Sequence, residues 1–451
     1  MRHTFTLPHR YVGLLIAVFL ILSGLTGAVI SWDHELDDWL NSQLMEARGT
    51  GTALSSVEIA KQIEARYPKV LVTYLPIGIE PGESYGFSVS PKRDPATNLL
   101  YKPGFNQVFI DPTTGDELGK REWGMVWPIT KETFVSFLYK FHYTLHLPEM
   151  WGKDRWGIWL LGIIAILWAL DSFIGFYLTL PTKRRVFKQT PKKQAVIKPA
   201  MVKLESDATA DLHITNLSTN VPLPVSKSWW QRWQPAWKVR WASGGAKLNF
   251  DLHRAFGLWT WGLLFIIAFT AFSLNLYREV FYPVMTKVSK VTPSPFDLRP
   301  RAPKHEPITP TRQFAEVIAK AQDDAKARGW TEPVGSALYN QSFGIYGVQF
   351  YHPEDGHGAG GVGHKRLYYD AQDGRYLGDR QPWKGTAADI FLQAQFPIHS
   401  GRILGFPGRI LISAMGLVVA MLSVTGIVIW WRKRASRHGY SDKKTRKSLL
   451  S

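Results

Sequence analysis

Four long apolar stretches alternate with polar segments along the 451-residue chain. An α-helix rises about 1.5 Å per residue, so about 20 apolar residues cross a hydrocarbon core of roughly 30 Å. Each stretch has about this length and almost no charge; they are residues 11–32, 156–180, 256–276 and 407–431. The pattern predicts an integral membrane protein with four transmembrane helices.

The polar segments after the first and third stretches repeat one order of elements. Each begins with a helical pattern, at residues 56–66 and 312–328, and continues with short alternating stretches typical of strands. The strand patterns cover residues 70–74, 85–90 and 107–119 in the first segment, and 343–351 and 367–378 in the second. We interpret this repetition as an internal duplication.

These patterns predict an α+β membrane protein made of two duplicated halves, each with two transmembrane helices and one external α+β domain. The expected boundaries are 1–32 for a cytoplasmic N-terminus and helix 1, 33–129 for the first external domain, 130–181 for an interfacial helix and helix 2, 182–248 for a cytoplasmic basic, Trp-rich loop, 249–280 for helix 3, 281–384 for the second external domain, 385–432 for an interfacial helix and helix 4, and 433–451 for a basic cytoplasmic tail.

Basic residues are concentrated in residues 1–10, 181–250 and 432–451, which together contain 23 Lys and Arg but 4 Asp and Glu. The net charge of +18 therefore comes from these segments, and no nucleic-acid partner is needed to explain it. Because Lys and Arg are retained on the cytoplasmic side, we expect both termini and the 181–250 loop in the cytoplasm. The chain has no cysteine, which excludes disulfides, thiolate-bound iron-sulfur clusters and covalently attached c-type haem.

Four histidines occupy matching positions in the two halves. His9 and His253 open the first and third apolar stretches in the motif His-Arg-x-x-Gly-Leu, and His146 and His399 precede the second and fourth. The expected topology places the first two near the inner face of the membrane and the other two near the outer face. Facing imidazoles can supply both axial ligands of a haem iron, so we expect one haem site at each face. Hydrogen bonding to lipid headgroups is the alternative for each histidine.

Small residues lie at the depths of these histidines. They are Thr26-Gly27 and Thr270-Ala271 in the outer halves of helices 1 and 3, and Ile174-Gly175 and Thr425-Gly426 in the inner halves of helices 2 and 4. Small residues let helices or a flat ring approach closely. We therefore expect each histidine pair to face a notch on the other two helices, with ordinary helix packing as the alternative.

Four arginines lie beside the candidate ligands. Arg10 and Arg254 follow the inner histidines directly, and Arg155 and Arg409 lie near the outer ones. The outer two oppose the usual distribution of positive charge across a membrane. Haem propionates or lipid phosphates would both be suitable partners.

Two further residues are candidates for a role at these sites. His142 lies four residues before His146, on the same face if that stretch is helical. It is an alternative axial ligand, a group that hydrogen-bonds to a ligand, or a surface histidine. Asp171 lies within helix 2, where an ionised acid costs about 2.5 to 3.5 kcal/mol at the centre, which marks it as a functional candidate. An ion pair with Lys183 or Arg184 is the alternative.

Taken together, these motifs resemble those of the PepSY-associated transmembrane proteins, also called iron-regulated membrane proteins. The resemblance covers nearly the whole chain, although Pro8 stands where the family usually has Leu. It rests on the His-Arg-x-x-Gly-Leu motifs at His9 and His253, Gly24-Leu25-Thr26-Gly27, the Asp-x-x-x-Gly turns at Asp111 and Asp370, His399-Ser400-Gly401, Val424-Thr425-Gly426 and Trp430-Trp431-Arg432.

Members of this family include haem-containing ferric-siderophore reductases of the bacterial inner membrane. The resemblance implies two PepSY-like domains in the periplasm and two b-type haems, with His9, His253, His146 and His399 as the ligands of the haem iron. It also implies electron transfer to a periplasmic ferric siderophore, which releases the iron for uptake. The cytoplasmic segments contain no visible flavin or nicotinamide site, so we expect a separate cytoplasmic reductase or a membrane quinol as the electron donor.

Two other functions are compatible with the sequence. A non-redox, membrane-anchored module that binds a peptide or a metallophore would be colourless and would tolerate the loss of all four histidines. A transporter could use Asp171 as a proton relay, although four helices leave little room for a passage.

Overall fold

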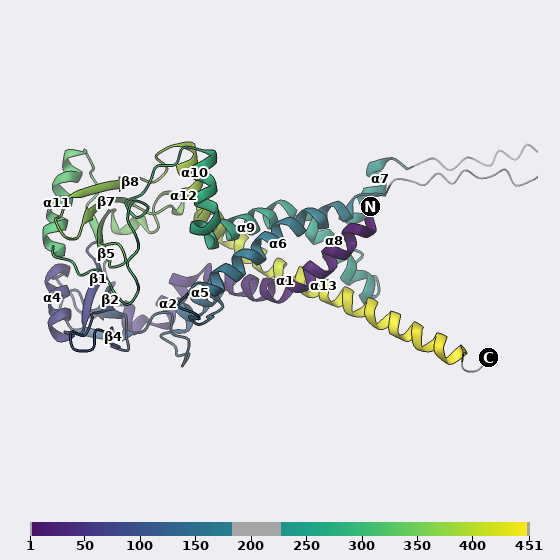
Figure 1. The fold of residues 1–451 in the computed structure, drawn as a ribbon, viewed down its shortest axis with the longest axis horizontal. Coiled ribbons are helices and arrows are strands. Elements are labelled where there is room, and N and C mark those ends of the chain that lie inside the picture. Colours follow the sequence, from purple (N-terminus) through teal and green to yellow (C-terminus); the bar gives the residue numbers. More distant parts are fainter. Residues whose placement is uncertain (1, 183–226, 449–451) are drawn as a thin grey trace, which may run out of the picture.

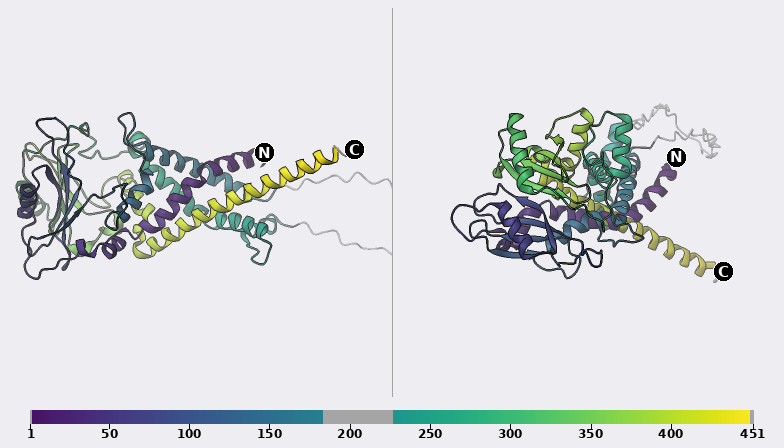
Figure 2. Two further views of the ribbon diagram at one scale, coloured as in Figure 1. Left: turned by 90° about the horizontal axis from the view of Figure 1, so that it is seen from below. Right: turned by 60° about the vertical axis from the view of Figure 1, so that its left-hand side comes forward.

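The structure is a computed structural model that describes residues 2–182 and 227–448. It consists of a helical bundle with a β-sheet domain at one end (Figures 1 and 2). The first helix begins, and the last helix ends, at the opposite end of the bundle. Residues 183–226, which include most of the predicted cytoplasmic loop and the proposed partners Lys183 and Arg184 of Asp171, lie outside the described residues.

Within the described residues, three helices are long and apolar enough to cross a membrane, and a bent helix pair brings the number to four if it forms one span. The bundle helices are α1 (Arg2–Ile30), α6 (Trp156–Thr179), the bent pair α8 (Gly245–Trp259) and α9 (Trp261–Asn275), and α13 (Gly405–Ser448). The prediction of a membrane protein with helical spans is confirmed.

The third predicted helix is not continuous. Its two parts, α8 and α9, meet at an angle of 71°. Thr260 lies between them with φ −105° and ψ 6°, outside helical geometry, and its hydroxyl donates to the carbonyl of Phe256 at 2.7 Å. A side-chain hydroxyl that competes for a helix carbonyl is a known cause of bending.

Helices from different halves of the chain pack against each other. The most extensive contact joins α1 to α13, and α6 packs mainly on α9. A Cβ added to Gly24 would lie 2.6 Å from the carbonyl oxygen of Gly416, so α1 and α13 are in backbone contact at these glycines. Gly162 of α6 makes room for the side chain of Leu276, which follows α9. The halves therefore interlock instead of forming separate bundles.

Eight strands of the described chain form one antiparallel sheet in the order β4-β3-β2-β1-β5-β6-β7-β8. The strands are β1 (Val70–Pro76), β2 (Tyr85–Pro91), β3 (Gln107–Ile110), β4 (Glu117–Arg121), β5 (Val334–Asn340), β6 (Ile345–Phe350), β7 (Lys365–Asp370) and β8 (Tyr376–Arg380). Strands β1 and β5 pair at Leu75 and Ala337 and so join the strand sets of the two halves. The sequence patterns did not predict this pairing, because they did not identify β5.

One hydrophobic core serves the whole sheet. Helices α4 (Ser56–Arg66) and α11 (Phe314–Ala327) contribute Ile59, Ile63 and Ala321 to a single cluster with strands of both halves. The predicted mixed α+β class is thus confirmed. The two predicted external domains share a continuous sheet and a common core.

The remaining helices of the described residues are short. Helices α5 and α12 lie between the sheet and the bundle (Figure 1). The full set of these short helices is α2 (Asp33–Leu40), α3 (Ser42–Met45), α5 (Phe134–Thr144), α7 (Trp229–Trp233), η1 (Gln234–Trp237), the π-helical turn η2 (Tyr277–Phe281), α10 (Tyr282–Val288), η3 (Pro353–Asp355), η4 (Ala359–Gly361), α12 (Ala387–Ser400) and η5 (Arg402–Leu404).

The aspartate of the first predicted Asp-x-x-x-Gly turn organises the backbone around it. Asp111 is buried, and its carboxylate accepts from the Thr113 hydroxyl at 2.7 Å and from the amides of Arg48 and Gly49 at 2.6 and 2.8 Å. Burial alone would raise the pKa of Asp111, but these hydrogen bonds together lower it. The turn is therefore a structural element that holds the segment before α4 against the sheet.

Candidate functional site

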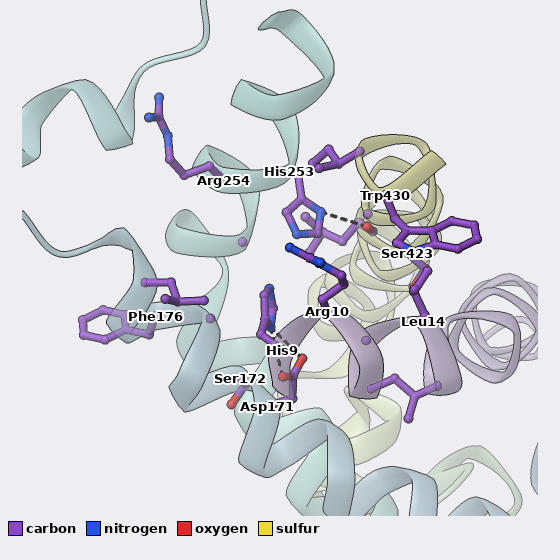
Figure 3. Close-up of a pocket in the computed structure, with 18 of the residues that line it drawn as sticks. His9, Arg10, Leu14, Asp171, Ser172, Phe176, His253, Arg254, Ser423 and Trp430 are labelled. Carbon is purple, nitrogen blue, oxygen red and sulfur yellow. Dashed lines mark hydrogen bonds and ion pairs between the residues drawn. The ribbon is translucent and has the colours of Figure 1, made fainter. Parts of the chain in front are cut away.

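The inner candidate site is a pair of histidines from the two halves. His9 of α1 and His253 of α8 have ring centroids 6.3 Å apart and an interplanar angle of 51°. They lie beside a cavity of about 390 Å³ between α1, α6, α8 and α13 (Figure 3). Four glycines line it, one from each of these helices: Gly13, Gly175, Gly257 and Gly426. The structure thus brings together the two inner histidines that the sequence identified.

Hydrogen bonds fix the tautomer of His253. Its Nδ1 lies 3.0 Å from the carbonyl oxygen of Leu422 and 3.1 Å from the hydroxyl of Thr425. The carbonyl can only accept, and the Thr425 hydroxyl donates its own proton to the Met421 carbonyl at 2.8 Å. Nδ1 must therefore carry the proton, which leaves a lone pair on Nε2.

His9 is held by a different partner. Its Nδ1 lies 3.0 Å from both carboxylate oxygens of Asp171 on α6 (Figure 3). The side chain of Asp171 is 9% exposed. An ionised carboxylate only accepts hydrogen bonds, so this contact also directs the proton to Nδ1 and leaves Nε2 free. Asp171, which the sequence marked as a functional candidate within helix 2, lies at the inner site.

The outer candidate site has the same geometry. His142 of α5 and His399 of α12 have ring centroids 6.3 Å apart and an interplanar angle of 51°. Their Nδ1 atoms lie 3.0 Å from the Thr26 hydroxyl and 2.9 Å from the Thr270 hydroxyl, respectively. Both threonines donate their own protons to helix carbonyls four residues earlier. Nδ1 therefore donates in both histidines, and Nε2 is again unprotonated.

The predicted pairing of His146 with His399 does not occur in the structure. Helix α5 ends at Thr144, and Leu145 and His146 have positive φ angles of 52° and 50°. The His146 ring folds back onto Phe137 at 4.6 Å, with Nε2 3.0 Å from the Phe137 carbonyl oxygen. His142, one turn earlier, takes the position opposite His399. The comparison of the two halves was therefore out of register by one helical turn at this point.

The predicted small residues lie directly behind three of the imidazoles. A Cβ added to Gly27, Gly175 or Gly426 would lie 3.0, 3.3 and 3.2 Å from the ring Cε1 of His142, His9 and His253, respectively. A larger side chain would displace each ring. The glycines thus leave space for imidazoles held flat against a neighbouring helix.

The spacing within each pair matches two ligands of one metal ion. A metal–imidazole bond is about 2 Å long and a ring nitrogen lies about 1.1 Å from its centroid, so two imidazoles on opposite sides of one ion have centroids about 6.2 Å apart. Both pairs have 6.3 Å. Among the described residues, no group of three or more His, Cys, Asp or Glu could hold a metal ion. Such a metal would need further ligands besides the two imidazoles.

The four candidate arginines differ in what they contact. Arg409 pairs with Glu35 through two bonds of 2.6 Å, and Arg155 pairs with Glu279 at 2.9 Å. Arg254 lines the cavity, but its guanidinium donates to the Pro235 carbonyl and to Asp251. Arg10 also lines the cavity. The outer two arginines are therefore occupied by carboxylates.

Sequence reasoning missed two other cations at this cavity. Arg2 and Lys433 line it together with Arg10. Arg2 lies seven residues before His9, two helical turns away on the same face of α1, a spacing that could have indicated its position. Lys433 comes from the far end of the chain, and no local signal connects it to His9.

Comparison with known proteins identifies the family of the chain. A search of curated proteins gives no match. The family model described as PepSY-associated TM region matches twice, at residues 7–215 and 227–433. Each match contains one inner histidine, one outer histidine and one of the two strand sets. The chain therefore belongs to the PepSY-associated TM region family and contains two copies of its repeat.

Proposed function

We propose that the chain is an inner-membrane reductase that binds two b-type haems and passes electrons to a ferric siderophore in the periplasm. One observation carries this proposal. The two histidine pairs have the same spacing between ring centroids. In all four of these histidines, Nδ1 is hydrogen-bonded to another group of the protein. Within the described residues, no hydrogen bond involves Nε2 of any of the four. Histidines that ligate metals commonly have this arrangement, because the Nδ1 bond fixes the tautomer and the ring orientation.

His9 and His253 would hold the inner haem, and His142 and His399 the outer one. This assignment replaces His146 by His142. Arg10, Arg2 and Lys433 at the inner cavity would pair with the haem propionates. A haem bound by two imidazoles supplies one-electron transfer without an open coordination position.

Apolar packing separates the two sites. His9 and Thr26 are 17 residues apart on α1, a rise of about 25 Å, so the two pairs lie near opposite ends of the membrane-spanning bundle. Between them pack the buried apolar residues Leu264, Met415 and Val419. An apolar interior prevents leakage of protons and ions while electrons pass.

The distribution of basic residues supports electron transfer from the cytoplasm to the periplasm. The basic segments 2–10 and 432–448 lie at the end of the bundle with the inner pair, and the sheet lies at the other end (Figure 1). With the basic end in the cytoplasm, the outer pair and the sheet face the periplasm. Electrons would enter from a cytoplasmic reductase or a membrane quinol. Reduction of Fe(III) to Fe(II) weakens its binding by hard oxygen ligands and releases the iron.

The proposed reaction can be tested with the purified chain in detergent. The protein is reduced under argon, freed of reductant and mixed with a ferric hydroxamate siderophore and an Fe(II)-specific chelator. We expect the haem bands to return to the oxidised form, with about one Fe(II) captured per electron. The His399→Ala variant should react much more slowly, because it lacks an outer ligand. A reduced wild-type protein that hydroxamate, catecholate and citrate complexes of Fe(III) all fail to reoxidise would contradict the proposed substrate class.

A further inference from the structure

Three arginines from distant parts of the chain meet in one recess where the sheet adjoins the bundle. The recess has a volume of about 230 Å³ and is lined by Arg155, Arg278, Arg301, Asn340, Ser342 and Phe343. Arg155 precedes α6, Arg278 lies in η2 after α9, and Arg301 precedes α11. The recess is therefore built from two bundle helices and from the sheet domain.

Two of the three arginines in this recess have no ion-pair partner among the described residues. Arg155 pairs with Glu279. Arg278 stacks on the Phe343 ring at 5.6 Å, and neither Arg278 nor Arg301 forms an ion pair with any described residue. Two unpaired guanidiniums in one small recess repel each other, and a bound anion removes that repulsion. Planar guanidiniums bind oxyanions through paired hydrogen bonds.

The position of the recess indicates which oxyanion is available. Arg155 and Arg278 lie at the sheet-side ends of α6 and α9, the level at which these helices leave the membrane. Trp156 and Trp159 lie beside them, and the Trp159 indole donates to Glu279 at 2.8 Å. Tryptophans concentrate at the headgroup level of membranes. We propose that the recess binds the phosphate group of a phospholipid in the leaflet nearest the sheet, and that this lipid fixes the sheet domain to the bundle.

Native mass spectrometry of the purified chain tests this proposal. Delipidated protein is titrated with short-chain phosphatidylglycerol and, separately, with inorganic phosphate. We expect one phosphatidylglycerol to bind with an affinity that falls about tenfold or more in the Arg278→Gln/Arg301→Gln variant, because two charged contacts are lost. Lys304→Gln is the control, since Lys304 is exposed, lies in the same segment and does not line the recess.

Equal lipid binding by the double variant and the wild type would overturn the proposal. Stronger retention of inorganic phosphate than of the lipid would also overturn it, because the recess would then be a site for a soluble anion. Neither result depends on the haem content of the protein.

A second inference, which rests on the proposed function, concerns the difference between the two inner histidines. Helix α6 presents Asp171 to His9, whereas α13 presents only the Leu422 carbonyl and the Thr425 hydroxyl to His253. The two outer histidines have only threonine hydroxyls at Nδ1. Of the four candidate ligands, His9 alone is bonded to a carboxylate within the described residues.

A carboxylate at Nδ1 makes the imidazole more basic and stabilises the oxidised state of a metal bound at Nε2. The effect is strong here because the Asp171 side chain is nearly buried among apolar helices. We infer that Asp171 is the positioning residue of the inner haem and lowers its reduction potential. Electrons would then leave the inner haem readily for the outer one, which has no such carboxylate. Arg2, Arg10 and Lys433 act in the opposite sense, so a substitution of Asp171 is needed to isolate its contribution.

A spectroelectrochemical titration of the purified chain tests this role. We expect Asp171→Asn to shift the reduction potential of one haem upward, to leave the other unchanged, and to retain both haems. Asp171→Glu should restore part of the shift. Thr425→Val is the matched control, because it removes a neutral acceptor from His253 while the Leu422 carbonyl remains, and its shift should be smaller.

The possible outcomes separate this inference from the proposed function. If both haems are present and neither potential changes in Asp171→Asn, the tuning role is wrong and the haem sites stand. If the wild-type protein binds no haem, the proposed function fails first. Loss of the inner haem in Asp171→Asn together with an unshifted potential in Asp171→Glu would show that the carboxylate only holds His9 in place.

Discussion

Replacing His142 by Ala should remove one of two haems, whereas replacing His146 by Ala should leave both. The reason is geometric: His142 faces His399 with centroids 6.3 Å apart, while the His146 ring lies on Phe137 with Nε2 at that residue's carbonyl. His399→Ala should match His142→Ala. The measurement is the haem-to-protein ratio of each purified variant, which we expect to fall from about two to about one in His142→Ala and His399→Ala.

The His146→Ala variant is the control for this prediction. It loses a stacked ring on Phe137 and should lower the stability by about 1 kcal/mol, so its melting temperature is measured beside its haem content. The reverse pattern, with the outer haem absent from His146→Ala and present in His142→Ala, would show that the outer ligand is His146. It would also mean that α5 continues past Thr144 when haem is bound.

Replacing Gly175 or Gly426 by Leu should abolish haem binding at the inner site while the outer haem is retained. A Cβ at either position lies within 3.3 Å of the ring carbon Cε1 of His9 or His253, and the rest of a leucine side chain cannot fit behind the ring. The imidazole must then turn away, and Nε2 loses its position. We expect the haem-to-protein ratio to fall from about two to about one.

Gly262→Leu is the matched control for these substitutions. Gly262 lies in α9, within the bundle, and a Cβ added there meets no heavy atom within 4 Å. It therefore introduces the same apolar side chain into a bundle helix without reaching a histidine. Full inner-haem occupancy in Gly175→Leu and Gly426→Leu would contradict the proposed ligand positions, and equal loss in Gly262→Leu would point to general misfolding.

The inner site could be predicted from the sequence more closely than the outer one. His9 and His253 begin long apolar stretches in the same short motif, so helical geometry and the duplication fix their depth. The outer ligands lie on α5 and α12, which follow long external segments of unequal length. No periodic pattern fixes their register, and the aligned histidine, His146, lies beyond the helix end at Thr144.

Other features depend on contacts between residues far apart in the chain. The bond between Asp171 and His9 joins α6 to α1, and no sequence spacing indicates it. Strand β5 contains Gly335, Ser336 and Asn340 and lacks a clear alternation, so its pairing with β1 was not foreseen. The bend at Thr260 was hidden because the apolar stretch continues without a charge or a proline.

The haem content of the purified chain tests the central claim most directly. Protein made in haem-sufficient cells is purified in detergent, its haem is quantified, and a dithionite-reduced minus oxidised spectrum is recorded. The account predicts about two b-type haems per chain, both low-spin with two imidazole ligands. A colourless protein, or one whose haem content is unchanged when His9, His142, His253 and His399 are all replaced, would contradict it and favour a membrane-anchored binding module.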